Sequence, residues 1–422
     1  MPTPSVGLAP ETSERIDMQD LSRFPARPTL ALCLTAAWFA ALASLDESAR
    51  LRADEPAAPA AARAATGRID STLDVSSLVD RLEAARARGD VPGLSAAVVV
   101  DGRLVWSGGV GLADIENQVP ATGTTVYRIA SISKPIAATA VMQQVEAGRV
   151  ALDDLIQQYV PSFPEKEQGP ITIRHLLTHT SGIRHYRPGE FLSRTRYDSL
   201  EEAIGIFRDD PLLFAPGDEY RYTSYGYNLL AGVVESASGQ PFDVYLREHI
   251  FAPSGMSSAC CERAEEIVPG RARCYVRQNG QIENAPYVDL SIKWAGGGII
   301  ASAEDLVRFD IALNQGRLLR PPTLDEMYTP ATLNDGSTTS YALGWSITTD
   351  DEGRTWVAHS GGSTGSTTRL LRCPAEKLSV AVLANLQSCP VVAPTARNLA
   401  SLVLGTASEA AAADDPAAGA TQ

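Results

Sequence analysis

The sequence predicts an α+β fold in which strands from both chain ends form one antiparallel sheet, with a mostly helical lobe inserted between them. Two observations lead to this prediction. Strand-like runs lie near the start of the globular body and again near its end, at 94–100, 103–107, 341–348, 367–372 and 378–384. Helical periodicity dominates the stretch between about 130 and 290. Because strands must pair and bury a face, the two groups are expected to share one sheet flanked by helices.

A helix and a hairpin open the body. Four apolar residues in the segment 75–87 recur at helical spacing, which predicts an amphipathic helix. The run LSAAVVV at 94–100 is followed by Asp101-Gly102 and then by RLVWS, and this is the pattern of a hairpin with a tight turn. The body is therefore expected to begin in the order helix, strand, strand.

Helices and loops fill the middle of the body. Five segments have helical periodicity and are separated by loops that contain Pro and Gly. They cover 132–148, 172–179, 198–208, 225–237 and 241–250. Ser302, with Asp305 three residues on, is expected to cap another helix, and a last helix is expected over 393–404.

The composition excludes several classes of protein. The chain has 422 residues, 44% hydrophobic and 20% charged, so it can bury a large core and is neither mainly disordered nor collagen-like. Its 36 Lys and Arg against 50 Asp and Glu give a net charge of -14, which argues against a general affinity for nucleic acid or anionic lipid. The chain has four lysines, Lys134, Lys166, Lys293 and Lys377. Because arginine keeps its proton, these four are the candidates for chemistry that needs a neutral side-chain amine.

The N-terminal region is interpreted as a secretory signal. The apolar run 29–45 follows two arginines and contains the small-x-small cleavage pattern Ala41-Leu42-Ala43, so residues 1–43 are expected to be an extension with a signal peptide. Met18 is the expected start, because acidic residues precede it. An uncleaved membrane anchor is the alternative, since 17 apolar residues are at the lower limit for spanning a bilayer. Either interpretation predicts an exported body, periplasmic or secreted.

Two segments of low complexity flank the body. Residues 44–68 are rich in Ala, Pro, Glu and Arg and are expected to form a linker. Residues 406–422 contain mainly Ala, Asp, Gly and Pro and are expected to be a disordered tail. The body, 69–405, is long enough for one discontinuous unit or two lobes, with the helical lobe at about 130–290.

The strongest candidate for chemistry is the pair Ser131 and Lys134, in RIASISKP. Residues three apart at a helix N-terminus lie on one face, so the hydroxyl and the amine can meet. A serine needs a base to become nucleophilic, and a lysine can serve only if desolvation or nearby positive charge lowers its pKa. The segment is otherwise apolar, where a solvated lysine would be out of place. We therefore interpret Ser131 as a nucleophile and Lys134 as its base.

A second candidate segment, YTS, lies just before the helix at 225–237. Its phenol, Tyr222, could relay a proton from a serine–lysine pair to a leaving group. Ser224 is a further polar side chain at this helix start. A buried tyrosine with a purely structural role is the alternative.

A third candidate segment, His359-Ser360-Gly361-Gly362, ends the strand-like run TWVA. Its glycines would allow close approach of the backbone to a ligand, and its N–H groups could form half of an oxyanion hole. Its imidazole and hydroxyl could bind a substrate carboxylate. An ordinary junction of strand and turn has the same composition.

Together the three segments resemble the serine β-lactamase and penicillin-binding protein superfamily, whose signature is Ser-x-x-Lys, then Tyr-x-Asn or Ser-x-Asn, then Lys or His followed by Thr/Ser-Gly. Longer segments, including ITIRHLLTHTSGIRHY, PYVDLSIKWAGGG and AHSGGSTG, are similar to the branch with the mitochondrial serine β-lactamase-like proteins of animals and related bacterial hydrolases. The resemblance covers about 90–388. It implies a β-lactamase/transpeptidase-like fold.

The resemblance also implies a mechanism by acylation and deacylation, with no cofactor and no metal. Ser131 would be the acylated nucleophile, Lys134 its base and Tyr222 the proton relay. The backbone N–H groups of Ser131 and Gly362 would form the oxyanion hole.

Two departures from the β-lactamase pattern concern the substrate side, where the resemblance places His359 and Ser360. Ser224 stands where Asn is usual, and His359 stands where lactamases that clear antibiotics carry Lys. Serine is shorter than Asn, so carbonyl recognition is expected to differ. These departures favour peptide, amide or ester substrates over efficient β-lactam hydrolysis.

Other patterns are weaker. Gly361 to Gly365 matches the Gly-x-Ser-x-Gly elbow of α/β-hydrolases, but a strand-like run follows it instead of a helix, and no histidine lies downstream. His175, His179 and His185 suggest a zinc site, but Leu176 stands where a metalloprotease helix has Glu, and structural roles are favoured.

Cysteine pairing is left open by the sequence. Once the signal is removed, the cysteines are Cys260, Cys261, Cys274, Cys373 and Cys389. An odd number leaves at least one thiol unpaired within the chain. The expected bridge joins Cys274 to Cys260 or Cys261.

The sequence therefore predicts an exported serine hydrolase with a small peptide, amide or ester substrate and no nucleic-acid partner. A homo-oligomer is compatible with it. The alternative of a different class is a vestigial site in a protein that serves as a binding or self-assembling scaffold. The presence of all the side chains that the chemistry needs argues against that alternative.

Overall fold

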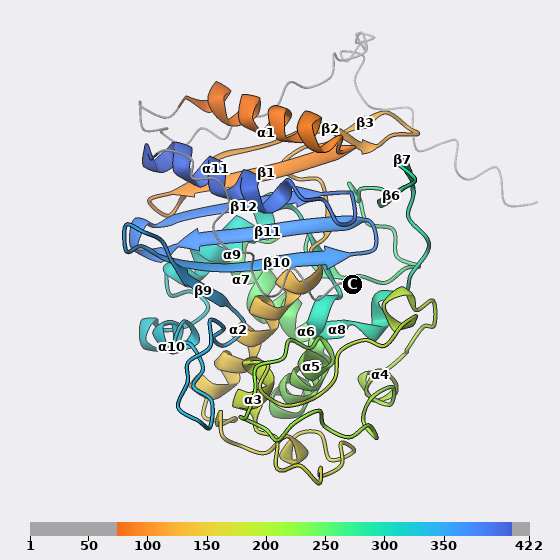
Figure 1. The fold of residues 1–422 in the computed structure, drawn as a ribbon, viewed down its shortest axis with the longest axis vertical. Helices are drawn as coiled ribbons and strands as arrows, with labels where there is room; N and C mark the ends of the chain where they lie inside the picture. Colours follow the sequence, from red (N-terminus) through yellow and green to blue (C-terminus); the bar gives the residue numbers. More distant parts are fainter. Residues whose placement is uncertain (1–73, 407–422) are drawn as a thin grey trace, which may run out of the picture. The chain divides into compact units, whose positions relative to one another are not determined.

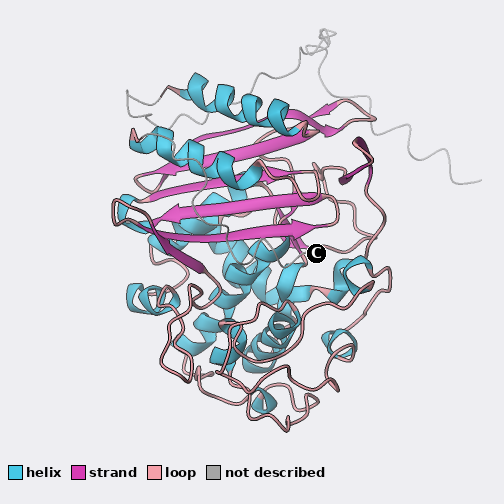
Figure 2. Cartoon of the chain, viewed as in Figure 1, coloured by secondary structure: helices cyan, strands magenta, loops and turns pink. Residues whose placement is uncertain are grey.

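Seven antiparallel strands from both ends of the body form one sheet in the computed structural model, which describes residues 74–406 (Figures 1 and 2). The order is β3-β2-β1-β12-β11-β10-β9. The strands are β1 (Gly93–Val100), β2 (Arg103–Asp114), β3 (Val119–Pro120), β9 (Ser346–Thr349), β10 (Thr355–Ser363), β11 (Ser366–Cys373) and β12 (Leu378–Ala384). In the centre of the sheet β1 pairs with β12, and Leu94 lies opposite Ala384. The predicted sheet built from both ends is confirmed.

Helices cover both faces of this sheet (Figure 1). α1 (Val75–Gly89) and α11 (Val392–Leu404) pack on one face, against side chains such as Ala96 and Val98 of β1. Ala97 and Val99 point to the other face, toward α2 (Ser133–Glu146) and α9 (Ala303–Asn314). Because β1 is buried on both faces, its run is apolar apart from Ser95 and does not alternate with polar residues.

The inserted lobe is mostly helical, as predicted, but several helices are shorter than their periodic segments. The remaining α-helices are α3 (Ile173–Leu177), α4 (Leu200–Ile204), α5 (Tyr225–Ser238), α6 (Phe242–Leu246), α7 (Ala252–Ser254), α8 (Trp294–Gly297) and α10 (Pro321–Met327). α3 ends because His179, two residues past its last residue, has a φ of 59°, and α4 ends at Gly205. Apolar spacing continues beyond these points because the following loops are also buried.

Two small sheets accompany the large sheet among the described residues. One has the order β4-β8-β5 and joins β4 (Tyr127–Arg128), β8 (Ile299–Ala301) and β5 (Cys260–Cys261). The other is the hairpin of β6 (Tyr275–Gln278) and β7 (Gln281–Asn284). The β4-β8-β5 sheet ties the two ends of the helical lobe together, because β4 leads into it and β8 leads out of it.

Two expectations from the sequence need correction. The strand expected over 341–348 is limited to Ser346–Thr349, because Gly344 has a φ of 87° and turns the chain just before it. The expected bridge from Cys274 is wrong: all five cysteines of the described residues are free. Cys274 lies against the turn at Gly365, whereas the other two candidates are held in β5 by pairing with β8.

The apolar run 29–45, the linker over 44–68 and the tail after residue 406 lie outside the described residues. Among the residues that the structure describes, no helix combines the length and the hydropathy needed to cross a bilayer.

A buried ion pair joins the sheet to α9. Arg372 of β11 and Asp310 of α9 are both fully buried and in direct contact. Asn314 completes the arrangement, since its amide donates to Asp310 at 3.1 Å and its oxygen accepts from the guanidinium at 3.0 Å. The hydroxyl of Tyr328 also bonds to Arg372. The charge of Arg372 is therefore compensated entirely inside the protein.

We expect Asp310→Ala to lower the free energy of unfolding by about 3–5 kcal/mol, because it leaves a guanidinium buried without its counter-ion. The matched control is Asp198→Ala, which removes an exposed partner of Arg196 and should cost at most about 1 kcal/mol. Urea unfolding followed by circular dichroism measures both. Equal losses of unfolding free energy in the two variants would contradict a stabilising role for the buried ion pair of Arg372 and Asp310.

Candidate active site

Ser131 lies in a single helical turn, Ala130–Ile132, which leads directly into α2. Ala130, just before it, has a φ of 50°, a conformation that is costly for a residue with a Cβ and that is found in strained sites. Hydroxyls of β11 hold the incoming segment: Thr368 donates to the carbonyl of Ile129 at 2.9 Å, and Ser366 donates to that of Arg128 at 2.6 Å. The sheet thus positions the serine before α2 begins.

Lys134 lies one turn further along α2 and is fully buried. Its Nζ is 3.1 Å from Oγ of Ser131 and 3.1 Å from Oγ of Ser224, and it donates to the carbonyl of Gly296 at 2.6 Å. The spacing of three residues therefore brings the hydroxyl and the amine into hydrogen-bond contact. Two other elements of the lobe supply the remaining contacts of the amine.

The surroundings of Lys134 favour its neutral form. Burial holds the pKa of this amine well below its ordinary value of 10.5, and the positive charge of Lys293 lowers it further. None of the ion pairs that the structure records involves Lys134; its three hydrogen-bond partners are two hydroxyls and a carbonyl. A neutral amine in hydrogen-bond contact with a serine hydroxyl can act as the general base that activates this nucleophile.

Tyr222 and Ser224 reach the same site from the loop before α5. The ring centroid of Tyr222 lies 4.7 Å from Nζ of Lys134. Two histidines hold this loop through its backbone: Nδ1 of His179 accepts from the N–H of Thr223 at 3.3 Å, and Nδ1 of His185 accepts from that of Ser224 at 3.1 Å. Burial lowers the pKa of His179 well below 6.5, which keeps that nitrogen available as an acceptor.

The glycines of β10 have different neighbours. Gly362 lines the pocket together with Ser131. A Cβ on Gly361 would lie 2.3 Å from the carbonyl oxygen of Ile129, so this glycine lets β10 approach the segment before the nucleophile. The sequence predicted that a ligand would approach the backbone at these glycines; at Gly361 it is the backbone of Ile129 that approaches.

Among the polar residues of β10, Ser363 lines this pocket with Ser131, whereas His359 and Ser360 do not. His359 is fully buried; its Nε2 lies 2.9 Å from the hydroxyl of Tyr341 and its Nδ1 lies 2.7 Å from the carbonyl of Ser360. The side chain of Ser360 accepts from Arg369 at 2.6 Å, on the sheet face that α1 and α11 cover. Alternation along the strand places it there, because Ala358 points to that same face.

Several residues of the pocket were not singled out as site residues from the sequence. These are Lys293, Tyr186 and Phe191; Gly296 and Gly297 also line it, and for them the sequence left a cleft and tight backbone packing as equal alternatives. The glycines belong to WAGGG, whose composition is a usable signal for close packing near a cleft. The aromatic residues carry no comparable local signal, because only the fold brings the 186–191 loop to the nucleophile.

The two rival motifs do not form their own sites. Gly361 to Gly365 ends β10 and turns into β11, so the helix that a nucleophile elbow needs is absent at this position. His175 belongs to the cap of α3, where its Nδ1 accepts from the N–H of Thr172 at 3.2 Å.

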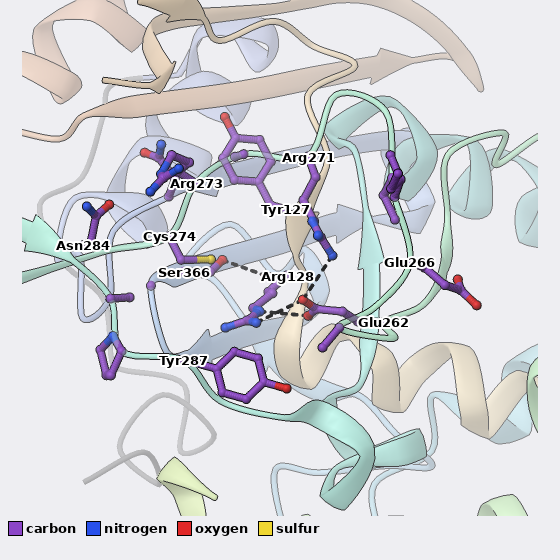
Figure 3. Close-up of a pocket in the computed structure, with 18 of the residues that line it drawn as sticks. Tyr127, Arg128, Glu262, Glu266, Arg271, Arg273, Cys274, Asn284, Tyr287 and Ser366 are labelled. Atoms are coloured by element: carbon purple, nitrogen blue, oxygen red, sulfur yellow. Dashed lines mark hydrogen bonds and ion pairs between the residues drawn. The ribbon is translucent and has the colours of Figure 1, made fainter. Parts of the chain in front are cut away.

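A larger cavity of about 660 Å³ is lined by residues other than those of the Ser131 pocket (Figure 3). Arg128 of β4 and the turn at Gly365 contribute to its lining. Glu262 holds Arg128 by two hydrogen bonds of 2.8 and 3.0 Å and lies 3.6 Å from Arg271. The charges that face this cavity are therefore largely paired with one another.

Comparison with known proteins matches the chain to the family described as Beta-lactamase over residues 78–404. The chain is 31% identical to the serine beta-lactamase-like protein LACTB, mitochondrial, of Mus musculus, over 77% of this chain and 76% of that protein. It is 30% identical to Penicillin-binding protein 4* of Bacillus subtilis (strain 168), over 67% of this chain and 66% of that protein.

Solved structures agree with these matches. The octameric penicillin-binding protein homologue from Pyrococcus abyssi has a TM-score of 0.69 and 26% identity, over 79% of this chain and 78% of that chain. A D-stereospecific amidohydrolase from Streptomyces sp. has a TM-score of 0.67 and 26% identity, over 79% of this chain and all of that chain (100%). D-amino acid amidase from Ochrobactrum anthropi SV3 has a TM-score of 0.67 and 25% identity, over 78% and 97% of the two chains.

We expect Gly361→Ala to destabilise the protein by about 1–3 kcal/mol, because the new methyl group must displace the backbone that carries the nucleophile. Gly297→Ala is the control, since a Cβ there would make ordinary contacts of 3.7 Å or more in the same pocket. Thermal unfolding of the two variants measures the difference. A loss of stability for Gly297→Ala as large as that for Gly361→Ala would show that the close contacts with Ile129 and Thr368 are not the cause.

Proposed function

The chain belongs to the β-lactamase-like family of serine hydrolases, and on that premise we propose that it cleaves peptide, amide or ester bonds through an acyl-enzyme on Ser131. One observation carries the proposal. The fully buried amine of Lys134, with its lowered pKa, lies 3.1 Å from the hydroxyl of Ser131. No other described lysine is in hydrogen-bond contact with a serine hydroxyl.

The contacts of Lys134 support its role as the base. A neutral amine has two N–H groups and one lone pair. The carbonyl of Gly296 and the hydroxyl of Ser224 can take the two N–H groups, which leaves the lone pair directed at Ser131. The amine can therefore accept the proton of Ser131 when Oγ attacks a carbonyl carbon.

The open edge of β10 supports an oxyanion hole. Ser363 and Ser366 flank a two-residue turn, so they form a hydrogen-bonded pair of the hairpin. Alternation then directs the N–H of Gly362 away from β11, toward the pocket that holds Ser131. The N–H groups of Gly362 and Ser131 would stabilise the charge that develops on the carbonyl oxygen.

The proposed cycle balances without a cofactor. The Oγ–carbon bond forms as the proton of Ser131 passes to Lys134, and the bond to the leaving group breaks as that proton passes on, directly or through Tyr222. The ring of Tyr222, 4.7 Å from Nζ, favours the transient ammonium. Water then attacks the ester, gives a proton to Lys134 and releases the acid, and the proton returns to Ser131.

Structural relatives support the proposed substrate class. They include a D-stereospecific amidohydrolase and a D-amino acid amidase, which supports amide or peptide bonds as targets. His359 is buried and engaged with Tyr341, and Ser360 faces the other side of the sheet, so neither supports the carboxylate contact predicted from the sequence. Recognition of a substrate anion would need another residue.

Export and self-association complete the proposal. The apolar run 29–45 with its Ala-x-Ala pattern supports export. The octameric state named for the Pyrococcus abyssi protein supports a homo-oligomer. A vestigial scaffold is the remaining alternative, and the intact contact between Ser131 and Lys134 argues against it.

A fluorophosphonate probe should label the wild type in proportion to active protein, and Ser131→Ala should abolish the labelling, because it removes the only atom that bonds to phosphorus. Ser162→Ala, at an exposed serine, is the control and should label like the wild type. Intact mass and peptide mapping locate the adduct. If the wild type is not labelled, the proposal of a serine hydrolase is refuted and the vestigial scaffold remains.

The rate of labelling should rise with pH and reach its plateau well below 10.5, because Lys134 acts in its neutral form and burial lowers its pKa. Lys134→Met should slow labelling by about 10²-fold or more. Lys134→Arg, which keeps the charge but cannot accept the proton, should be equally slow. The second-order rate constant across the pH range measures this. A rate that still climbs near 10.5 would show that Lys134 is not the base.

A further inference from the structure

A second buried lysine faces the pocket of Ser131. Lys293 lies immediately before α8 and is 3% exposed, and its Nζ has no hydrogen-bond partner among the described residues. No carboxylate pairs with it in the part of the chain that the structure describes. Burying an amine without a partner is costly, so this position needs an explanation beyond packing.

Aromatic rings surround the amine of Lys293. Its Nζ lies 3.9 Å from the ring centroid of Phe191 and 5.9 Å from that of Tyr186. Ring faces attract a cation without neutralising it. Glu262 also acts on this amine, but its two oxygens already bind Arg128, and Arg271 lies 3.6 Å away. The rings thus attract a cation at this position, but no described carboxylate is free to pair with it.

The state of Lys293 depends on what enters the pocket. Burial, and next the charge of Arg128, lower its pKa to about 7, so the ammonium and the neutral amine coexist near neutral pH. An anion brought next to Nζ would favour the ammonium and supply the missing partner. Lys293 lines the same pocket as Ser131 and Gly362, so such an anion would belong to a molecule bound at the nucleophile.

We propose that Lys293 is a specificity residue that binds a carboxylate of the substrate beside Ser131. The inference rests on the proposed function, since it assigns the substrate class of that same site. The preferred substrates carry a carboxylate close to the scissile bond, next to an apolar group that fits Phe191 and Tyr186. The carboxylate lies either on the acyl part, as in an acidic side chain, or on the leaving group, as at a peptide C-terminus.

The test compares esters that differ in one charge. On the acyl side, the 4-nitrophenyl monoester of glutaric acid is compared with 4-nitrophenyl pentanoate. On the leaving side, the 3-carboxy-4-nitrophenyl and 4-nitrophenyl esters of pentanoic acid are compared. The ratio of kcat/KM for anionic over neutral ester is measured for the wild type and for Lys293→Met, below pH 7.

In at least one series, the ratio for the wild type should exceed that for Lys293→Met by roughly tenfold to hundredfold, the range for a hydrogen bond to a charged group. Loss of Lys293 also changes the repulsion felt by Lys134, but this acts on both esters of a pair and cancels in the ratio. Lys377→Met, an exposed lysine, changes the net charge equally and should keep the wild-type ratio. Lys293→Arg should retain a preference for the anion.

Two outcomes separate this inference from the proposed function. If the kcat/KM ratios of the wild type and Lys293→Met are equal in both series, the role of Lys293 is overturned. If hydrolysis of the neutral esters still depends on Ser131 in that case, the proposed hydrolase function stands.

If no ester is hydrolysed, the binding of glutarate and benzoate to the wild type, measured by calorimetry, decides the role of Lys293. If the wild type binds these carboxylates and Lys293→Met does not, the carboxylate site is supported. If the wild type does not bind them, the carboxylate site is overturned. The same calorimetry replaces the kinetics if a variant proves unstable.

Discussion

The contact between the amine of Lys134 and the hydroxyl of Ser131 is the interaction on which the rest of the site depends. A lysine is useful to a serine only when it is neutral, and burial is what makes it neutral. α2 is accordingly buried on almost all sides. The amine then needs polar partners inside the core, and Ser224 and Gly296 supply them from two distant segments.

Positioning of these partners explains much of the surrounding architecture. The hydroxyls of β11 hold the segment before Ser131, and Gly361 lets β10 lie directly against it. His179 and His185 act on the backbone of the loop that carries Ser224, so histidines that suggested a metal from their spacing instead order a loop. The sheet edge and the helical lobe therefore meet at one point, the turn at Ser131.

The two pocket lysines show how environment divides one residue type into two roles. Lys134 has three polar contacts and a pKa well below its ordinary value. Lys293 has ring faces around it, no hydrogen-bond partner among the described residues and a pKa of about 7. The first is suited to take a proton, and the second is suited to hold an anion. The positive charge of Lys293 also lowers the pKa of Lys134.

The sequence by itself determined what depends on local spacing: the pairing of Ser131 with Lys134 three residues on, the strands at both chain ends, and the family. Tertiary structure decided what depends on register and long-range packing. It turned Ser360 to the far face of the sheet, left Cys274 unpaired and brought Lys293 to the nucleophile. The physical reason is that a spacing along one helix sets a distance within that helix. Contacts between residues far apart in the sequence, such as Lys134 and Gly296, which are 162 residues apart, exist only once the core has formed.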